Sequence, residues 1–126
     1  MKFKIDKYEK YTIVAIGEEK VNSTVAPEIK SEFLNLAQDG VLSVIVNMEG
    51  VKYIDSSGLS ALLVGNRTFS ERGVFVIFSV TDHVMKLINI SQLDKVMNIV
   101  ENQEEAADVV LMSEIRKSAD SDEQMI

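Results

Sequence analysis

Apolar and polar residues alternate near the N-terminus in a way that predicts two short strands. Phe3 and Ile5 point to one side between charged neighbours, and residues 11–16 form a second, more apolar run. Only Glu9 and Lys10 separate the two periodic runs. We therefore expect an antiparallel hairpin at the start of the chain.

Beyond this hairpin, apolar residues recur alternately with the spacing of helices and the spacing of strands. Strands that alternate with helices imply parallel pairs joined by right-handed crossovers. The sequence therefore predicts a single α/β domain, with a mixed, mostly parallel sheet, an N-terminal antiparallel hairpin and about four helices. After the hairpin we expect a helix ending at 39–40, a strand at 42–48, a helix at 57–73, a strand at 74–80, a short helix after 82, a strand at 96–100 and a helix at 101–112.

The regular apolar spacing fades after Met112. Residues 113–126 read SEIRKSADSDEQMI, a polar segment with more acidic than basic side chains. We therefore expect one domain over residues 1–112, followed by an acidic tail over residues 113–126 that is frayed or disordered.

Charge and composition exclude several classes of function. The net charge is −7, and residues 101–126, with 8 acidic and 2 basic side chains, carry −6 of it. Without a basic patch, nucleic acid is not expected as a direct partner. No apolar run approaches the roughly 20 residues of a membrane helix. We expect a cytoplasmic protein that does not contact a membrane.

The residues that usually build metal sites or disulfides are scarce. The chain has no cysteine, and His83 is its single histidine. A disulfide framework, a thiolate metal site and a histidine-based triad are therefore not expected. No glycine-rich phosphate-binding motif is present, so we expect no cofactor.

The stretch Asp55-Ser56-Ser57-Gly58 lies where the predicted central strand gives way to the next helix. Backbone N–H groups at a helix start lack partners, so this position suits a capping side chain and tolerates a phosphate. Ser57 is therefore a helix cap, a nucleophile or a phosphorylation switch. A nucleophile needs a neighbouring base, and nothing in the sequence fixes His83 near Ser57. The motif is also not the Gly-x-Ser-x-Gly elbow of serine hydrolases. We expect no catalytic residue and no enzyme.

Capping is the commonest explanation of such residues. Asp55 has the same structural interpretation, as a carboxylate that accepts N–H groups of the helix start. If Ser57 is a phosphorylation switch, Asp55 would orient the Ser57 hydroxyl or repel a phosphate bound to it. Gly58 is explained by close packing of the helix start or by a backbone position that disfavours a side chain.

From Tyr53 to Leu59 the chain resembles the anti-sigma factor antagonist family, the STAS domains. The similarity runs from about Phe3 to Met112 and includes the hairpin, the central strand and the final helix. It implies that Ser57 is the phosphorylation site and Asp55 its flanking acidic residue. In that family the unphosphorylated protein binds an anti-sigma factor that is also a serine kinase, and a metal-dependent serine phosphatase resets the phosphorylated form.

Two positions differ from the pattern of that family. Asn22, near the start of the first helix, and Asn47, at the end of the central strand, stand where aspartate is common. Asparagine caps a helix about as well as aspartate, so the fold is unaffected, but a negative charge is lost at each position. An alternative therefore stays open: a STAS scaffold or subunit of a transporter or signalling complex that works without phosphorylation.

A partner is expected on the helix face that begins at an accessible Ser57. Helical spacing places Ser60, Ala61 and Val64 on this face. The expected site contains Ser57 as phosphoacceptor, flanked by Asp55, Ser56, Gly58, Ser60, Ala61, Val64 and Asn22.

Overall fold

The structure, a computed structural model, describes the backbone of residues 3–125 and the side chains of residues 3–118. This part of the chain forms a five-stranded sheet, a two-stranded sheet, four α-helices and one short 3-10 helix. The predicted α/β fold is confirmed. In chain order the elements are β1 (Phe3–Lys7), β2 (Thr12–Ile16), β3 (Lys20–Val21), α1 (Ala26–Gln38), β4 (Val44–Asn47), β5 (Tyr53–Ile54), α2 (Ser56–Ser70), β6 (Phe75–Phe78), α3 (Asp82–Ile90), η1 (Leu93–Lys95), β7 (Asn98–Val100) and α4 (Gln103–Met125).

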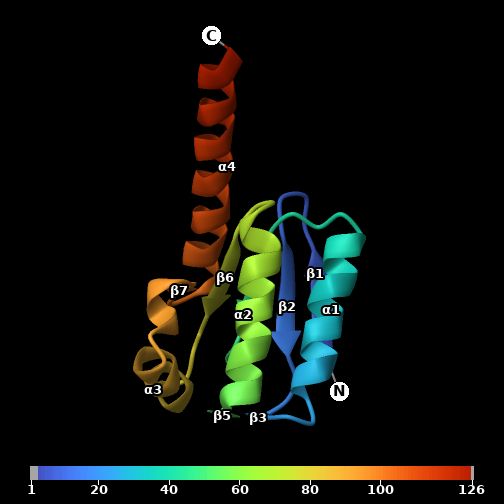
Figure 1. Ribbon diagram of the computed structural model, residues 1–126, viewed down its shortest axis with the longest axis vertical. Helices are drawn as coiled ribbons and strands as arrows, with labels where there is room; N and C mark the ends of the chain where they lie inside the picture. Colours follow the sequence, from blue (N-terminus) through green and yellow to red (C-terminus); the bar gives the residue numbers. More distant parts are fainter. Residues whose placement is uncertain (1–2, 126) are drawn as a thin grey trace.

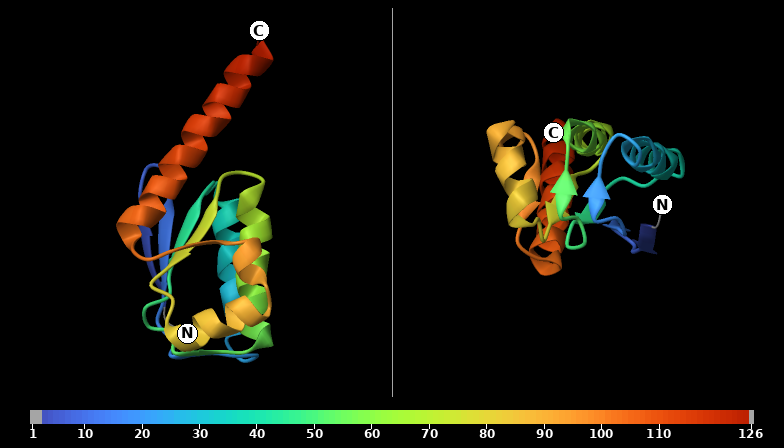
Figure 2. Two further views of the ribbon diagram at one scale, coloured as in Figure 1. Left: turned by 90° about the vertical axis from the view of Figure 1, so that its left-hand side faces the viewer. Right: turned by 90° about the horizontal axis from the view of Figure 1, so that it is seen from below.

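The large sheet has the strand order β1-β2-β4-β6-β7, so β4, the predicted central strand, lies at its middle. β1 runs antiparallel to β2, and the other neighbouring pairs are parallel. From β2 onward each new strand is added at the same edge, and right-handed crossovers then carry α1, α2 and α3 to one face. α4 follows the last strand and covers the other face (Figures 1 and 2).

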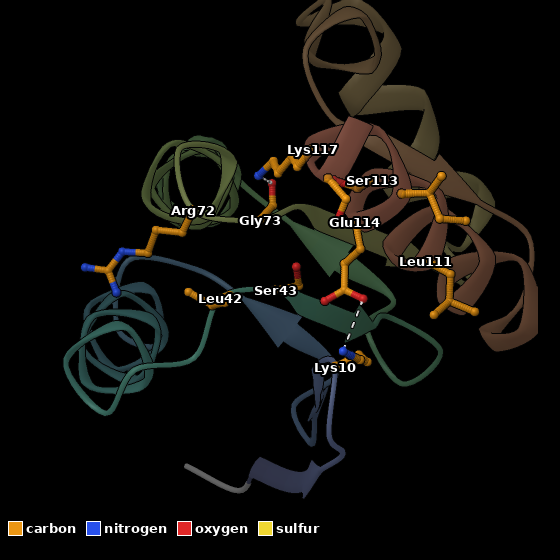
Figure 3. Close-up of a pocket in the computed structure, with 11 residues that line it drawn as sticks. Lys10, Leu42, Ser43, Arg72, Gly73, Leu111, Ser113, Glu114 and Lys117 are labelled. Atoms are coloured by element: carbon orange, nitrogen blue, oxygen red, sulfur yellow. Dashed lines mark hydrogen bonds and ion pairs between the residues drawn. The ribbon is translucent and has the colours of Figure 1, made fainter. Parts of the chain in front are cut away.

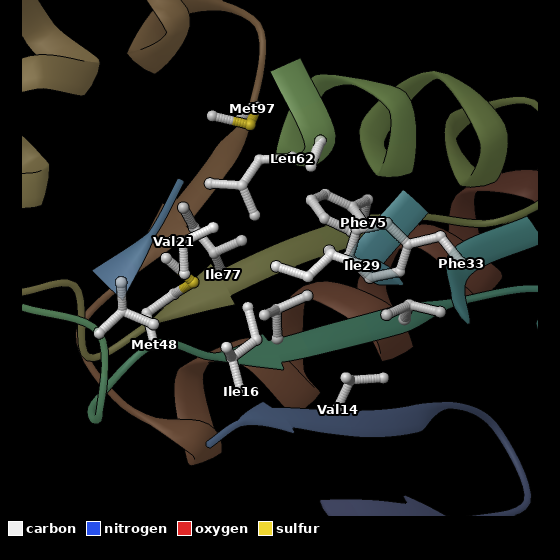
Figure 4. Close-up of a cluster of buried hydrophobic side chains, with 14 of the residues drawn as sticks. Val14, Ile16, Val21, Ile29, Phe33, Met48, Leu62, Phe75, Ile77 and Met97 are labelled. Carbon is white, nitrogen blue, oxygen red and sulfur yellow. The ribbon is translucent and has the colours of Figure 1, made fainter. Parts of the chain in front are cut away.

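The larger hydrophobic core lies between the sheet and the helices α1, α2 and α3 (Figure 4). Phe33 of α1 lies edge-on to Phe69 of α2 and to Phe75 of β6, with ring centroids 6.4 and 5.4 Å apart. A Cβ atom added to Gly65 of α2 would lie 2.6 Å from Phe75 Cε1 and 2.8 Å from Phe33 Cε2. The two helices therefore approach each other this closely because residue 65 has no side chain.

A smaller core lies on the opposite face of the sheet, under α4. Its buried members are Ile13, Ile45, Val76, Phe78, Ala106 and Val110. At the β1 end of this face the sheet is polar, because Lys4 and Asp6 are exposed there, in register with Ala15 and Ile13 of β2. The alternation of apolar and charged residues in β1 thus arises because one face of the strand packs on the larger core and the other is exposed to solvent.

The last helix is longer than the sequence predicted. We expected it to end at Met112 and the residues after it to be frayed or disordered, but α4 continues to Met125; residue 126 lies outside the described part of the chain. Residues 113–125 contain no glycine or proline and are rich in residues that adopt a helix readily. Loss of apolar periodicity there marks the loss of a buried face, while the helix itself continues. The assignment of residues 1–112 as the folded domain stays a prediction.

Replacing Gly65 with alanine should lower the free energy of unfolding by about 1–2 kcal/mol, because the added Cβ displaces two packed phenyl rings. Arg67→Ala, at an exposed position of the same helix, is the control and should change it by less than about 0.5 kcal/mol. Urea unfolding followed by circular dichroism measures both. Equal stability of Gly65→Ala and wild type would contradict the close helix packing.

Candidate functional site

The start of α2 is capped by Asp55, the residue before its first turn. Asp55 Oδ1 accepts a hydrogen bond of 3.0 Å from the Gly58 N–H, and the Asp55 carbonyl accepts another of 3.0 Å from Leu59 N. The backbone of Asp55 is extended, as expected of a cap residue. The capping interpretation therefore holds for Asp55 and is wrong for Ser57, which is the second residue of the helix.

Ser57 is partly exposed, and Ser56 beside it is exposed. Among the described residues, no group forms a hydrogen bond with the Ser57 hydroxyl. No buried side-chain oxygen or nitrogen in that part of the chain lacks a partner, so Ser57 Oγ must reach solvent. The expectation that Ser57 is accessible at a helix N-terminus is confirmed.

Two very short strands hold the helix start in place. β3 and β5 pair in parallel, with Lys20 beside Tyr53 and Val21 beside Ile54. The Asp55 N–H donates to the Val21 carbonyl at 3.2 Å. This hydrogen bond continues the pairing of the two strands by one residue, so Asn22 and Asp55 lie side by side at the same end of the small sheet.

Gly58 is buried where α2 presses on this pair of strands. A Cβ atom added there would lie 2.7 Å from the Val21 carbonyl oxygen and would also clash with Ile54 Cγ1. The expected close packing at Gly58 is therefore confirmed, and it fixes the distance between the capped helix start and the strands.

Asn22 shapes the turn that leads into α1. Its side-chain oxygen accepts a hydrogen bond of 3.0 Å from Thr24 N, and its carbonyl accepts from Val25 N and Ala26 N. Val25 occupies the N-cap position of α1, without a side-chain capping bond. Asn22 therefore stabilises the preceding turn. Asn47 acts similarly at the end of β4, where its side-chain oxygen accepts from Glu49 N at 3.0 Å.

The expected partner face of α2 is narrower than the sequence predicted. Ser60 and Val64 are partly exposed, but Ala61 is 0% exposed and belongs to the larger core. The prediction that Ala61 contributes to the surface is therefore wrong. Helical spacing places it one turn after Ser57, but the larger core buries it.

An aromatic group near the helix start was missed in the sequence. Tyr53, directly before Ile54 and Asp55, is 52% exposed, and its ring lies edge-on to the His83 ring at 5.2 Å between centroids. Lys20 Nζ lies 5.9 Å from the centre of the Tyr53 ring. Tyrosine is among the residues enriched in protein-binding surfaces.

The start of α3 is fixed to the same region. The Thr81 hydroxyl donates to the Val51 carbonyl at 2.8 Å, which holds His83 beside the strand that carries Tyr53. Tyr53 lies two residues before Asp55, so its position next to the motif could have been noticed in the sequence. The position of His83 could not, because it depends on the path of the chain between β6 and α3.

The described residues contain no group of three or more side chains suited to holding a metal ion. No helix in residues 3–125 is both long enough and apolar enough to cross a membrane. What the site offers is an exposed surface, formed by the α2 start, the β3–β5 pair and the α3 start, suited to contact with another protein.

Comparison with known proteins gives consistent matches. Residues 2–106 match the STAS domain family. The anti-sigma-B factor antagonist of Staphylococcus aureus is 30% identical over 97 residues, which cover 76% of this chain and 89% of that protein. An anti-sigma-factor antagonist (STAS) domain protein from Planctomyces limnophilus has the same fold, with a TM-score of 0.74 and 24% identity over 82% of this chain and 93% of that one.

A third match is the Bacillus cell fate determinant SpoIIAA, whose structure was solved in its phosphorylated form. It has a TM-score of 0.65 and 20% identity, and the match covers 85% of this chain and 97% of that one. At this identity the likeness shows a shared fold.

The cap at Asp55 can be tested separately from any function. Asp55→Ala removes the acceptor for Gly58 N and should lower the free energy of unfolding by about 1 kcal/mol. Asp55→Asn keeps a side-chain oxygen at this position and should retain most of that stability. Urea unfolding compares the two, and an Asp55→Ala variant as stable as Asp55→Asn would show that the cap contributes nothing.

Proposed function

The chain belongs to the STAS domain family, and from this we propose that it is an anti-sigma factor antagonist whose binding is switched by phosphorylation of Ser57. Unphosphorylated, it sequesters an anti-sigma factor that is also a serine kinase; phosphorylated, it releases it, and a metal-dependent serine phosphatase restores binding. The chain itself is a non-enzymatic, cytoplasmic binding module. The observation that carries this proposal is the accessible Ser57 hydroxyl, without a partner among the described residues, at a helix start capped by another residue.

Phosphorylation of Ser57 is compatible with the fold. The capping bond belongs to Asp55, so modification of the Ser57 hydroxyl breaks no hydrogen bond among the described residues. The N-terminus of a helix also carries a partial positive charge, which favours a phosphate. Asp55 lies two residues away, in the place expected of the flanking acidic residue.

The same phosphate is unfavourable once a partner covers the surface. It adds about −1.5 to −2 charges at neutral pH. Buried against a protein without a cation to pair with, it costs on the order of several kcal/mol. A loss of about 3 kcal/mol would already weaken binding by roughly a hundredfold. Ser60 and Val64, partly exposed on the face that Ser57 begins, would lie under the same partner.

The comparisons support this proposal at the level of the family. The S. aureus relative is named an anti-sigma-B factor antagonist. SpoIIAA, which shares the fold, was solved in a phosphorylated form. Neither match identifies the partner of this chain.

A second candidate is a STAS scaffold or subunit of a transporter or signalling complex that works without phosphorylation. The observation that favours it is the pair Asn22 and Asn47, neutral side chains that bond to local backbone N–H groups. Because these positions lack the negative charges of aspartate, a kinase or partner has fewer charged groups to recognise near the site.

Ser57→Ala should abolish phosphorylation by an anti-sigma-type serine kinase, while Ser56→Ala should leave it intact. The two serines are adjacent, so the pair of variants separates the site from its surroundings. Incubation with the kinase and ATP, followed by mass-spectrometric mapping, measures the outcome. Phosphate on Ser56, or none on the wild-type protein, would favour the scaffold.

Ser57→Asp should weaken binding of the anti-sigma factor by about tenfold or more, because a carboxylate is buried at the interface, while Ser57→Ala binds as wild type. Ser31→Asp adds the same charge at an exposed position of α1 and serves as the control. Calorimetric titration measures affinity, and circular dichroism checks that each variant is folded. Wild-type affinity of Ser57→Asp would contradict the switch.

A further inference from the structure

The exposed surface of α2 around Ser57 is small and mostly polar. Ser57, Ser60 and Val64 are partly exposed, and Ser56 beside them is exposed. A stable complex covers about 800 Å² on each partner, and the centre of the contact is apolar and rich in aromatic residues. Four short side chains cannot supply that area. A partner that covers Ser57 therefore also covers neighbouring elements.

One flank of α3 carries apolar side chains that begin beside this site. His83 lies edge-on to Tyr53, at 5.2 Å between ring centroids, and Tyr53 lies two residues before Asp55. Leu87 and Ile90 follow His83 by four and seven residues, so helical spacing places them on the same flank. Leu87 is partly exposed, and Ile90 is 69% exposed. This flank therefore continues the exposed surface from β5 to the end of α3.

After α3 the chain turns, and η1 lies beside α2 (Figures 1 and 2). Asn66 Nδ2 of α2 donates to the Val96 carbonyl at 3.1 Å, which fixes the end of this turn against the helix. The Val96 side chain is nevertheless 56% exposed. Leu63 lies about one turn before Asn66 on α2 and is partly exposed. Apolar side chains therefore border α2 on its α3 side as well.

These side chains form an apolar strip on the α3 side of α2, which consists of Tyr53, Leu63, Leu87, Ile90 and Val96. Three of its members are more than half exposed. An exposed group of large apolar side chains beside a polar site is typical of a surface that another protein covers. The strip also contains an aromatic residue, the kind of side chain that often dominates the binding energy of an interface.

We propose that the apolar strip anchors the anti-sigma factor, while Ser57 lies in the polar part of the same interface and controls its affinity. This inference rests on the proposed function. The strip is continuous with the surface around Ser57 and supplies the apolar area that this surface lacks, so one partner covers both. That partner presents apolar side chains to Ile90 and Val96, next to a polar region that meets the start of α2.

Ile90→Ser and Val96→Ser should each weaken binding of the anti-sigma-type serine kinase by about tenfold or more, because each removes apolar surface that the complex buries. Both side chains are more than half exposed, so both variants should fold as wild type. Circular dichroism checks the fold. Calorimetric titration with the same kinase that modifies Ser57 measures the affinity.

Met112→Ser is the matched control. Met112 is 57% exposed on α4, which lies on the opposite face of the sheet from α2. The helix is fixed near this position, because Lys117 Nζ donates to the Gly73 carbonyl at 3.0 Å and Lys10 Nζ lies 3.7 Å from Glu114 Oε2 (Figure 3). This variant also loses an exposed apolar side chain and should bind as wild type.

The kinetics of phosphorylation separate anchoring from an effect on the reaction at Ser57. A side chain that only holds the kinase contributes equally to substrate binding and to the transition state. Ile90→Ser and Val96→Ser should therefore raise KM by about tenfold or more and leave kcat within about twofold of wild type. A fall in kcat with an unchanged KM would contradict an anchoring role.

The outcomes distinguish this inference from the proposed function. If the wild-type protein does not bind the kinase, both are wrong. If Ser57→Asp weakens binding but Ile90→Ser and Val96→Ser bind as wild type, the proposed function stands and the strip lies outside the interface. An equal loss of affinity in Met112→Ser would show that the effect is not specific to the strip, and it would also overturn the inference.

Discussion

The handedness of the crossovers governs the architecture of this protein. Each parallel strand after β2 is added at the same edge of the sheet, so α1, α2 and α3 must all pack on one face. The other face would leave Ile13, Ile45, Val76 and Phe78 in water. The helix that follows the last strand is therefore required to complete the domain, and the first half of α4 covers these residues.

At the proposed site, separate residues hold the helix start and carry the switch. Asp55 caps the helix, and Gly58 allows it to pack on β3 and β5. Ser57 takes part in neither contact, so its hydroxyl remains available to solvent. A chemical change at Ser57 can therefore alter what binds to the surface with little effect on the fold beneath it.

Hydrophobic periodicity predicted the order of the main elements, because most of them have one buried face. It could not detect β3 and β5, which are two residues long. It also misplaced Ala61, which spacing within α2 puts one turn after Ser57 but which the larger core buries. Among the described side chains of α4 the last buried one is Val110, two residues before the expected helix end at Met112, although the helix itself continues to Met125.

The candidate site was recognisable because its motif is local in sequence. Asp55, Ser57 and Gly58 lie within four residues, and the chemistry of a helix start relates them directly. The contact of Tyr53 with His83 joins segments separated by two elements, and no single stretch of sequence contains it.

The continuity of α4 also limits how the length of this protein can change in evolution. Ala106 and Val110 rest on the sheet, while Glu114 and Lys117 reach Lys10 and Gly73, so one stripe of a single helix sets all four contacts. One residue inserted between Val110 and Glu114 would rotate everything after it by about 100° and shift it by about 1.5 Å. An insertion of seven residues, close to two full turns, would nearly restore the direction of the stripe, but it would shift Glu114 and Lys117 by about 10.5 Å and still break their contacts. Related chains should therefore keep the spacing between Val110 and Lys117 and vary in length after Lys117.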